Sequence, residues 1–156
     1  MLIGSVSDEQ YSALCDAVLE FINLRGESWE ARSRASGAVP VALPPGPYCV
    51  LDGNHWAFLG TDLKPGDRFG EKSLHRRSPG GASGHETDKV SPSTPTTVKF
   101  LAKGLNPNDG GAEMILFDTA SGGKVFSVGS INSVASLPVD EPVSQVTKNV
   151  LSRFLE

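Results

Sequence analysis

The chain has 156 residues with a formal net charge of -4, and 38% of its residues are hydrophobic. No basic stripe accompanies this acidic balance, which excludes a nucleic-acid-binding function, and no apolar run is long enough to span a membrane. Two cysteines are too few for a disulfide framework, so we expect a protein of the reducing cytoplasm.

The first predicted element is an amphipathic helix that follows a capping box. Ser7 has the N-cap role and Gln10 occupies the N3 position. Apolar side chains then recur at helical spacing as far as Gly26, which can end the helix: Tyr11, Leu14, Cys15, Val18, Phe21 and Ile22. Residues 27–47 contain several prolines, which exclude a central strand, so we predict a loop there.

Short apolar runs in the middle of the chain predict strands separated by turns. Residues 48–51 form the first run, and residues 55–60 follow, with Trp56 and Phe58 on one face if this stretch is extended. Residues 98–102 give a further strand. Residues 69–90 form a long loop rich in Gly, Ser and Pro, and a loop of this length inside one domain is usually functional or disordered.

The clearest signal is a hairpin within residues 111–131. Residues 114–117 are apolar, residues 125–128 are rich in β-branched and aromatic side chains, and residues 118–123 hold two glycines that suit a turn. Because the connection is short, the two strands must run antiparallel.

A final helix begins after Asp140, which is a good N-cap, and Pro142 fits its first turn. Its apolar stripe consists of Val143, Val146, Val150, Leu151 and Phe154. The order of elements predicts a layered α/β or α+β domain in which helices cover a small sheet, and periodicity alone does not choose between these two classes.

Cys49 does not fit a nucleophile elbow, because its neighbours in the sequence are large and no helix follows it. We therefore predict a strand cysteine that faces the core. Neither His55 nor His75 has a partner at metal-ligand spacing, so we interpret His55 as a strand-edge residue and His75 as a solvated one.

His85 differs, because Glu86 and Asp88 accompany it in a glycine-rich loop. Three ionisable groups on backbone that can approach a ligand closely could form an acid/base site or a metal site. The alternative is a polar loop whose carboxylates cap backbone N–H groups.

At these residues the sequence resembles the C-terminal part of the large (beta) subunit of the N,N-dimethylformamidase family. The matching motifs follow the order of that family. They are residues 55–58 with Gly60, the glycine-rich loop 80–88, residues 111–114, residues 122–131 and the closing segment 143–154. Residues 48–156 carry the strongest match, residues 27–47 match poorly, and the whole chain, 1–156, is interpreted as a single domain.

The resemblance implies an α/β fold with a class I glutamine amidotransferase-like layered sheet and flanking helices. It also implies hydrolysis of small N-substituted formamides to formate and an amine. The family uses iron held by two tyrosines and a glutamate upstream of the matched part, whereas Tyr11 and Tyr48, the tyrosines of this chain, lie outside that context. We therefore expect no iron or other cofactor in this chain, and the family's acid/base glutamate corresponds to Glu86, with His85 beside it.

Compared with the family, the chain looks truncated or like one part of a divided reading frame. A parallel sheet without its central strands would leave apolar surface exposed, which favours a homo-oligomer or a companion chain. We expect a site that is completed by another chain, so that this chain is inactive alone. The alternative is a non-catalytic domain that serves structure or assembly.

Overall fold

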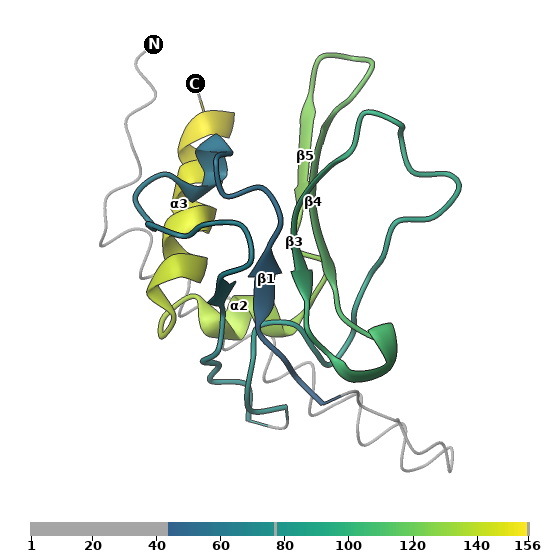
Figure 1. Ribbon diagram of the computed structural model, residues 1–156. Coiled ribbons are helices and arrows are strands. Elements are labelled where there is room, and N and C mark those ends of the chain that lie inside the picture. Colours follow the sequence, from purple (N-terminus) through teal and green to yellow (C-terminus); the bar gives the residue numbers. More distant parts are fainter. Residues whose placement is uncertain (1–43, 77, 156) are drawn as a thin grey trace.

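The computed structural model describes residues 44–76 and 78–155. Within them, one five-stranded sheet has the order β2-β1-β3-β4-β5, and every pairing is antiparallel (Figure 1). The strands are β1 (Tyr48–Val50), β2 (Arg68–Phe69), β3 (Lys99–Gly104), β4 (Glu113–Asp118) and β5 (Lys124–Ser127). The expectation of a parallel sheet is wrong for these residues, whereas the mixed α/β composition is confirmed. The predicted N-terminal helix lies outside the described residues.

The hairpin prediction is confirmed. β4 and β5 pair in a regular register in which Leu116 lies opposite Phe126 and Ile115 lies opposite Ser127. In the turn, Thr119 accepts the N–H of Gly123 on its side-chain oxygen at 2.9 Å, and Gly122 adopts a positive φ of 85°. The turn residues named by the sequence therefore close the hairpin as expected.

One side of this sheet is covered by helix α3 (Glu141–Phe154) and the 3-10 helix η1 (Trp56–Phe58), and α2 (Asn132–Ser136) lies near one end of it (Figure 1). Figure 1 shows α3 and η1 together on one side, whereas the segment that leads into β3 lies on the other. A second 3-10 turn, η2 (Pro107–Asp109), connects β3 to β4. Within the described residues, no helix has the length and hydrophobicity that crossing a bilayer requires.

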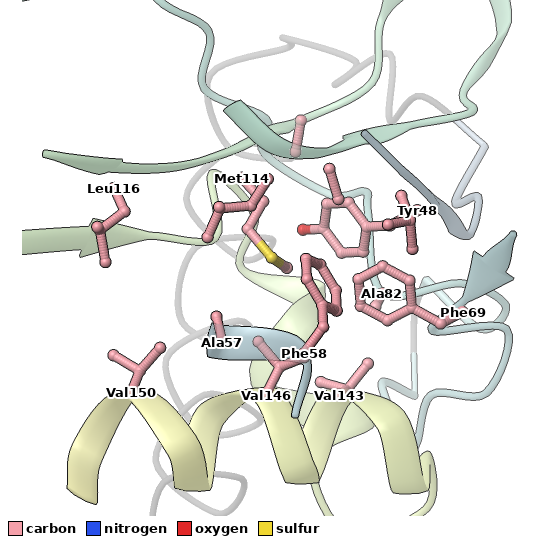
Figure 2. Packing of buried hydrophobic residues seen from close by; sticks show 14 residues of the cluster. Tyr48, Ala57, Phe58, Phe69, Ala82, Met114, Leu116, Val143, Val146 and Val150 are labelled. Carbon is pink, nitrogen blue, oxygen red and sulfur yellow. The ribbon is translucent and has the colours of Figure 1, made fainter. Parts of the chain in front are cut away.

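The core lies between the sheet and α3. Figure 2 shows Tyr48, Phe58 and Met114 between the strands and the helix, and all three are buried. Three residues of the predicted helical stripe, Val143, Val146 and Val150, are buried against them. Phe154 instead stays 38% exposed, because α3 continues past the edge of the core at that point.

Two local elements differ from what the sequence indicated, for identifiable reasons. Residues 56–58 form η1 instead of an extended strand, since His55 accepts the N–H of Ala57 on Nδ1 at 3.3 Å and caps a helical turn. The helix α2 was not predicted, because its buried residues are small or polar and give no apolar periodicity.

Glycines let backbone pack directly on backbone around the loop 80–88. A Cβ on Gly81 would lie 2.0 Å from the carbonyl carbon of Gly46, and one on Gly111 would lie 1.9 Å from the carbonyl oxygen of Gly104. A Cβ on Gly104 would lie 2.1 Å from Oγ of Ser83. These glycines are therefore required by close approach within the fold, and not by access for a ligand.

The Asp140 carboxylate joins the start of α3 to the segment after β2. Its Oδ1 accepts the N–H of Gly70 at 3.1 Å and that of Val143 at 3.3 Å, and its Oδ2 accepts the N–H of Lys72 at 3.4 Å. The predicted N-cap is thus confirmed, and this buried carboxylate is also a tertiary contact.

We predict that Asp140→Ala lowers the free energy of unfolding by about 2–3 kcal/mol, because buried backbone donors on two segments lose a charged acceptor. Urea titration followed by tryptophan fluorescence measures the change. Asp140→Asn, which keeps an oxygen at the capping position, should lose clearly less. Equal losses for the two variants would contradict the multiple role of the carboxylate.

We also predict that Gly81→Ala lowers the free energy of unfolding by about 3 kcal/mol or more, because the added methyl meets backbone that cannot move aside. The matched control is Gly122→Ala, where a Cβ meets nothing within 4 Å and only the positive φ opposes the side chain. The control should cost about 1 kcal/mol. A Gly81 variant as stable as the control would show that this contact is loose.

Candidate functional site

The glycine-rich loop 80–88 is fixed at its centre by Ser83, whose side chain is completely buried. Backbone bonds of 2.8 and 2.9 Å join Ser83 to Gly46 in both directions. The Ser83 hydroxyl donates to Oδ1 of Asn106 at 2.6 Å and accepts the N–H of Ala112 at 3.0 Å. Asn106 returns a bond from Nδ2 to the Ser83 carbonyl at 2.9 Å. The loop is therefore part of the folded interior at this point.

Two residues after β5 hold the loop from the other side. The Ser130 hydroxyl accepts the N–H of Gly84 at 2.9 Å and donates to the Gly84 carbonyl at 3.0 Å. The fully buried Asn132 donates from Nδ2 to the carbonyls of Ser78 at 2.8 Å and Gly81 at 3.2 Å. Buried side chains thus satisfy the loop's backbone groups where no strand ladder is available.

The end of the loop joins the hairpin through its backbone. The N–H of Asp88 donates to the Gly129 carbonyl at 2.7 Å, and the Asp88 carbonyl accepts the N–H of Glu113 at 3.0 Å. Thr87 adds a bond from its hydroxyl to the Gly110 carbonyl at 2.8 Å. The loop is consequently anchored on both sides of the two residues that it presents, His85 and Glu86.

Glu86 and Asp88 are exposed, whereas His85 is half-buried. His85 has a φ of 64°, and the flanking residues Gly84 and Glu86 form an isolated bridge around it. A left-handed conformation is uncommon for a residue with a side chain and costs of order 1 kcal/mol, which the surrounding anchors must offset. The loop therefore carries an exposed carboxylate and a half-buried imidazole on consecutive residues of an anchored backbone.

The alternative interpretation of the loop assigned its carboxylates to backbone capping. In the part of the chain that the structure describes, other side chains accept the backbone N–H groups. Ser130 bonds to Gly84, and Glu113 accepts the N–H of Val90 on Oε2 at 2.8 Å. The exposed carboxylates of Glu86 and Asp88 remain directed to the surface of the described fold.

The prediction that His75 is solvated is wrong, since its side chain is only 3% exposed. Its Nδ1 accepts the N–H of Ser78 at 3.0 Å, and its ring lies against that of His85 with centroids 5.0 Å apart. His55 is not a strand-edge residue either, because it caps η1. Burial lowers the pKa of the His55 imidazole. The structure thus joins His75 to the candidate site and leaves His55 outside it.

Cys49 lies on β1 as predicted, but it does not face the core. Strand alternation places the buried Tyr48 and Val50 on the core side, so the half-exposed Cys49 is on the opposite face. The prediction failed because the short run 48–51 is apolar on both faces, and a continuous run does not reveal which face is covered.

The family's iron ligands include tyrosines, and Tyr48 is the tyrosine among the described residues. The Tyr48 hydroxyl donates to the Val128 carbonyl at 2.7 Å, and burial raises the pKa of Tyr48, so its phenolate form is disfavoured. Within residues 44–76 and 78–155, no three His, Cys, Asp or Glu side chains gather as metal ligands. The metal interpretation of His85, Glu86 and Asp88 therefore finds no support among the described residues.

Sequence reasoning missed the buried polar residues that hold the site. Ser83, Asn106, Ser130 and Asn132 are all nearly or completely buried, yet each stands among turn-forming residues in the sequence. Such residues are mostly exposed in proteins, so composition alone assigns them to solvent. For Ser83 and Ser130 a usable signal was the neighbouring glycine, Gly84 or Gly129, which permits a close backbone approach.

The chain is similar to known proteins over most of its length. Residues 24–148 match the family described as N,N-dimethylformamidase beta subunit-like, C-terminal. The chain is 33% identical over 129 residues to the N,N-dimethylformamidase beta subunit of Paracoccus aminophilus, and 32% identical over 129 residues to that of an Alcaligenes species.

Each of these alignments covers 65% of this chain and 16% of the relative, so the chain spans a small part of the curated relatives that it matches. The family match itself includes all of the loop, both strands of the hairpin and the first half of α3. The chain belongs to the N,N-dimethylformamidase beta subunit-like, C-terminal family.

Proposed function

We propose that this chain is a domain of an amide hydrolase that converts N-substituted formamides to formate and an amine. In this proposal Glu86 and His85 enter an active site that a companion chain completes. The observation that carries the proposal is the loop itself. Buried side chains fix its backbone on both sides, while Glu86 stays exposed at the surface. Family membership supports the choice of chemistry.

The proposed chemistry needs a proton acceptor at the attacking water. The Glu86 carboxylate takes a proton from the water while the water oxygen bonds to the formyl carbon. The carbon–nitrogen bond of the resulting tetrahedral species then breaks, and the proton passes to the departing amine. Formic acid remains and ionises to formate. His85 lies next in sequence to Glu86 and is proposed to hydrogen bond the substrate or to share this proton.

Iron enters this proposal only through the companion chain. The ligands that the family resemblance implies lie upstream of the matched part, so no step of the chemistry above is assigned to a metal on this chain. Both relatives are beta subunits, which supports the proposal of a multi-chain assembly. We propose a cytoplasmic location as well, whereas the antiparallel pairing of the described strands does not support the amidotransferase-like sheet.

A second candidate function is non-catalytic assembly, and exposed apolar side chains favour it. Leu59 is 67% exposed beside α3, and Phe154 and Leu155 at the end of α3 are 38% and 40% exposed. Such side chains suit a contact with another chain. Either function therefore requires a partner, and the two differ in whether Glu86 takes part in chemistry.

We predict that the chain supports formate release from N,N-dimethylformamide when it is mixed with the Paracoccus aminophilus beta subunit from which the matching segment has been removed. Glu86→Gln should lower the rate by about 10²–10⁴-fold, because general-base assistance is lost, and it should leave the unfolding midpoint unchanged. Formate assay and urea titration measure the two quantities.

The matched control is Glu71→Gln, which changes another exposed glutamate outside the loop and should leave the rate unchanged. Iron content, measured for the chain alone and for the mixture, should be found only in the mixture. Full activity of the Glu86 variant would contradict the catalytic proposal. Stable assembly without any formate release would contradict it as well and would favour the non-catalytic function.

A further inference from the structure

We propose that His75 is the residue that positions the His85 imidazole. The functional consequence of this contact rests on the proposed function, because positioning His85 affects a reaction only if the loop takes part in catalysis. Its basis is the contact between the two rings, whose centroids are 5.0 Å apart with planes inclined at 38°. One ring is buried and the other is half-buried, so the pair extends from the interior toward the surface.

His75 is held firmly from its own segment. The N–H of Leu74 donates to the Ala135 carbonyl in α2 at 2.8 Å, which attaches this part of the chain to the helix. The N–H of His75 donates to the Ser73 hydroxyl at 3.2 Å, and its side chain is 3% exposed. A side chain enclosed in this way has little rotamer freedom left and offers a fixed surface to its neighbour.

The hydrogen bond from Ser78 also fixes the chemical form of the His75 ring. Nδ1 accepts the N–H of Ser78 at 3.0 Å, so it cannot carry a proton while this bond exists. The ring is then neutral and bears its proton on Nε2. The Ser78 carbonyl accepts Nδ2 of Asn132 at 2.8 Å, so the same residue connects His75 to α2.

His85 needs such support because its backbone is unusual. Its φ of 64° directs the side chain differently from that of an extended residue, and Ser130 fixes only the backbone of the preceding Gly84. The His75 ring supplies a face against which the His85 ring can rest. A fixed imidazole beside Glu86 loses less freedom when substrate binds, which is how positioning residues accelerate a reaction.

The contact can be tested on the full-length chain without any activity. In two-dimensional NMR spectra, the Hδ2 and Hε1 signals of His85 should move toward their values in an unstructured peptide in His75→Leu, which removes the aromatic ring. His75→Phe keeps an aromatic face and should retain most of the wild-type shift. The indole signal of Trp56 in η1, on a separate segment, reports that each variant has folded.

Unchanged His85 signals in a folded His75→Leu protein would overturn the proposal. If His75→Leu does not fold, His75→Phe and His75→Asn still decide between the two interpretations. Asn can replace the Nδ1 acceptor but has no ring. His75→Asn should therefore shift the His85 ring signals, whereas His75→Phe should not. Displacement by Phe with retention by Asn would show a purely structural role for the Ser78 bond and would also overturn the proposal.

Activity of the mixed assembly then separates this inference from the proposed function. We expect His75→Leu to lower kcat about tenfold with little change in KM, and His75→Phe to recover most of the loss. A displaced His85 with unchanged kcat would support the positioning contact and would contradict a role for His85 in hydrolysis.

Discussion

The buried hydroxyl of Ser83 donates to Asn106 and accepts from the backbone of Ala112, so one small side chain joins three segments of the chain. Replacement of this oxygen would leave a buried amide oxygen and a buried N–H without their partner, and such groups cost more than the bond itself contributes. The close approach also requires Gly104, where a Cβ would meet the same hydroxyl at 2.1 Å. The position of the candidate loop on the sheet depends on this contact.

Sequence patterns predicted the parts of the fold that local chemistry determines. The hairpin turn at Gly122, the N-cap Asp140 and the buried part of the stripe from Val143 to Val150 follow from neighbouring residues, and these are confirmed. The sheet's pairing and the burial of His75 depend on residues far apart in the chain, and short-range patterns do not report them. His75 in particular follows a stretch rich in charged residues, which indicates solvent exposure. In the structure, α2 and the loop enclose the His75 side chain.

The candidate site shows the same division. The sequence and its family resemblance drew attention to His85 and Glu86, but they explained the surrounding glycines by access for a ligand. In the structure, Gly81 and Gly111 allow backbone segments to touch, and the freedom of the loop is largely removed. This matters for function, because a carboxylate on an anchored loop is already oriented before a substrate or a companion chain arrives. Family membership alone did not reveal this property.

The central claim is that the glycine-rich loop is an anchored part of the core, and amide hydrogen exchange tests it most directly. The N–H groups of Ser83, Gly84 and Asp88 each donate within the fold, to Gly46, Ser130 and Gly129. The account predicts that they exchange as slowly as the amides shared by β3 and β4, because opening the loop requires opening the sheet. Exchange as fast as that of the exposed Ser93 would show that the loop opens independently, and would contradict the account.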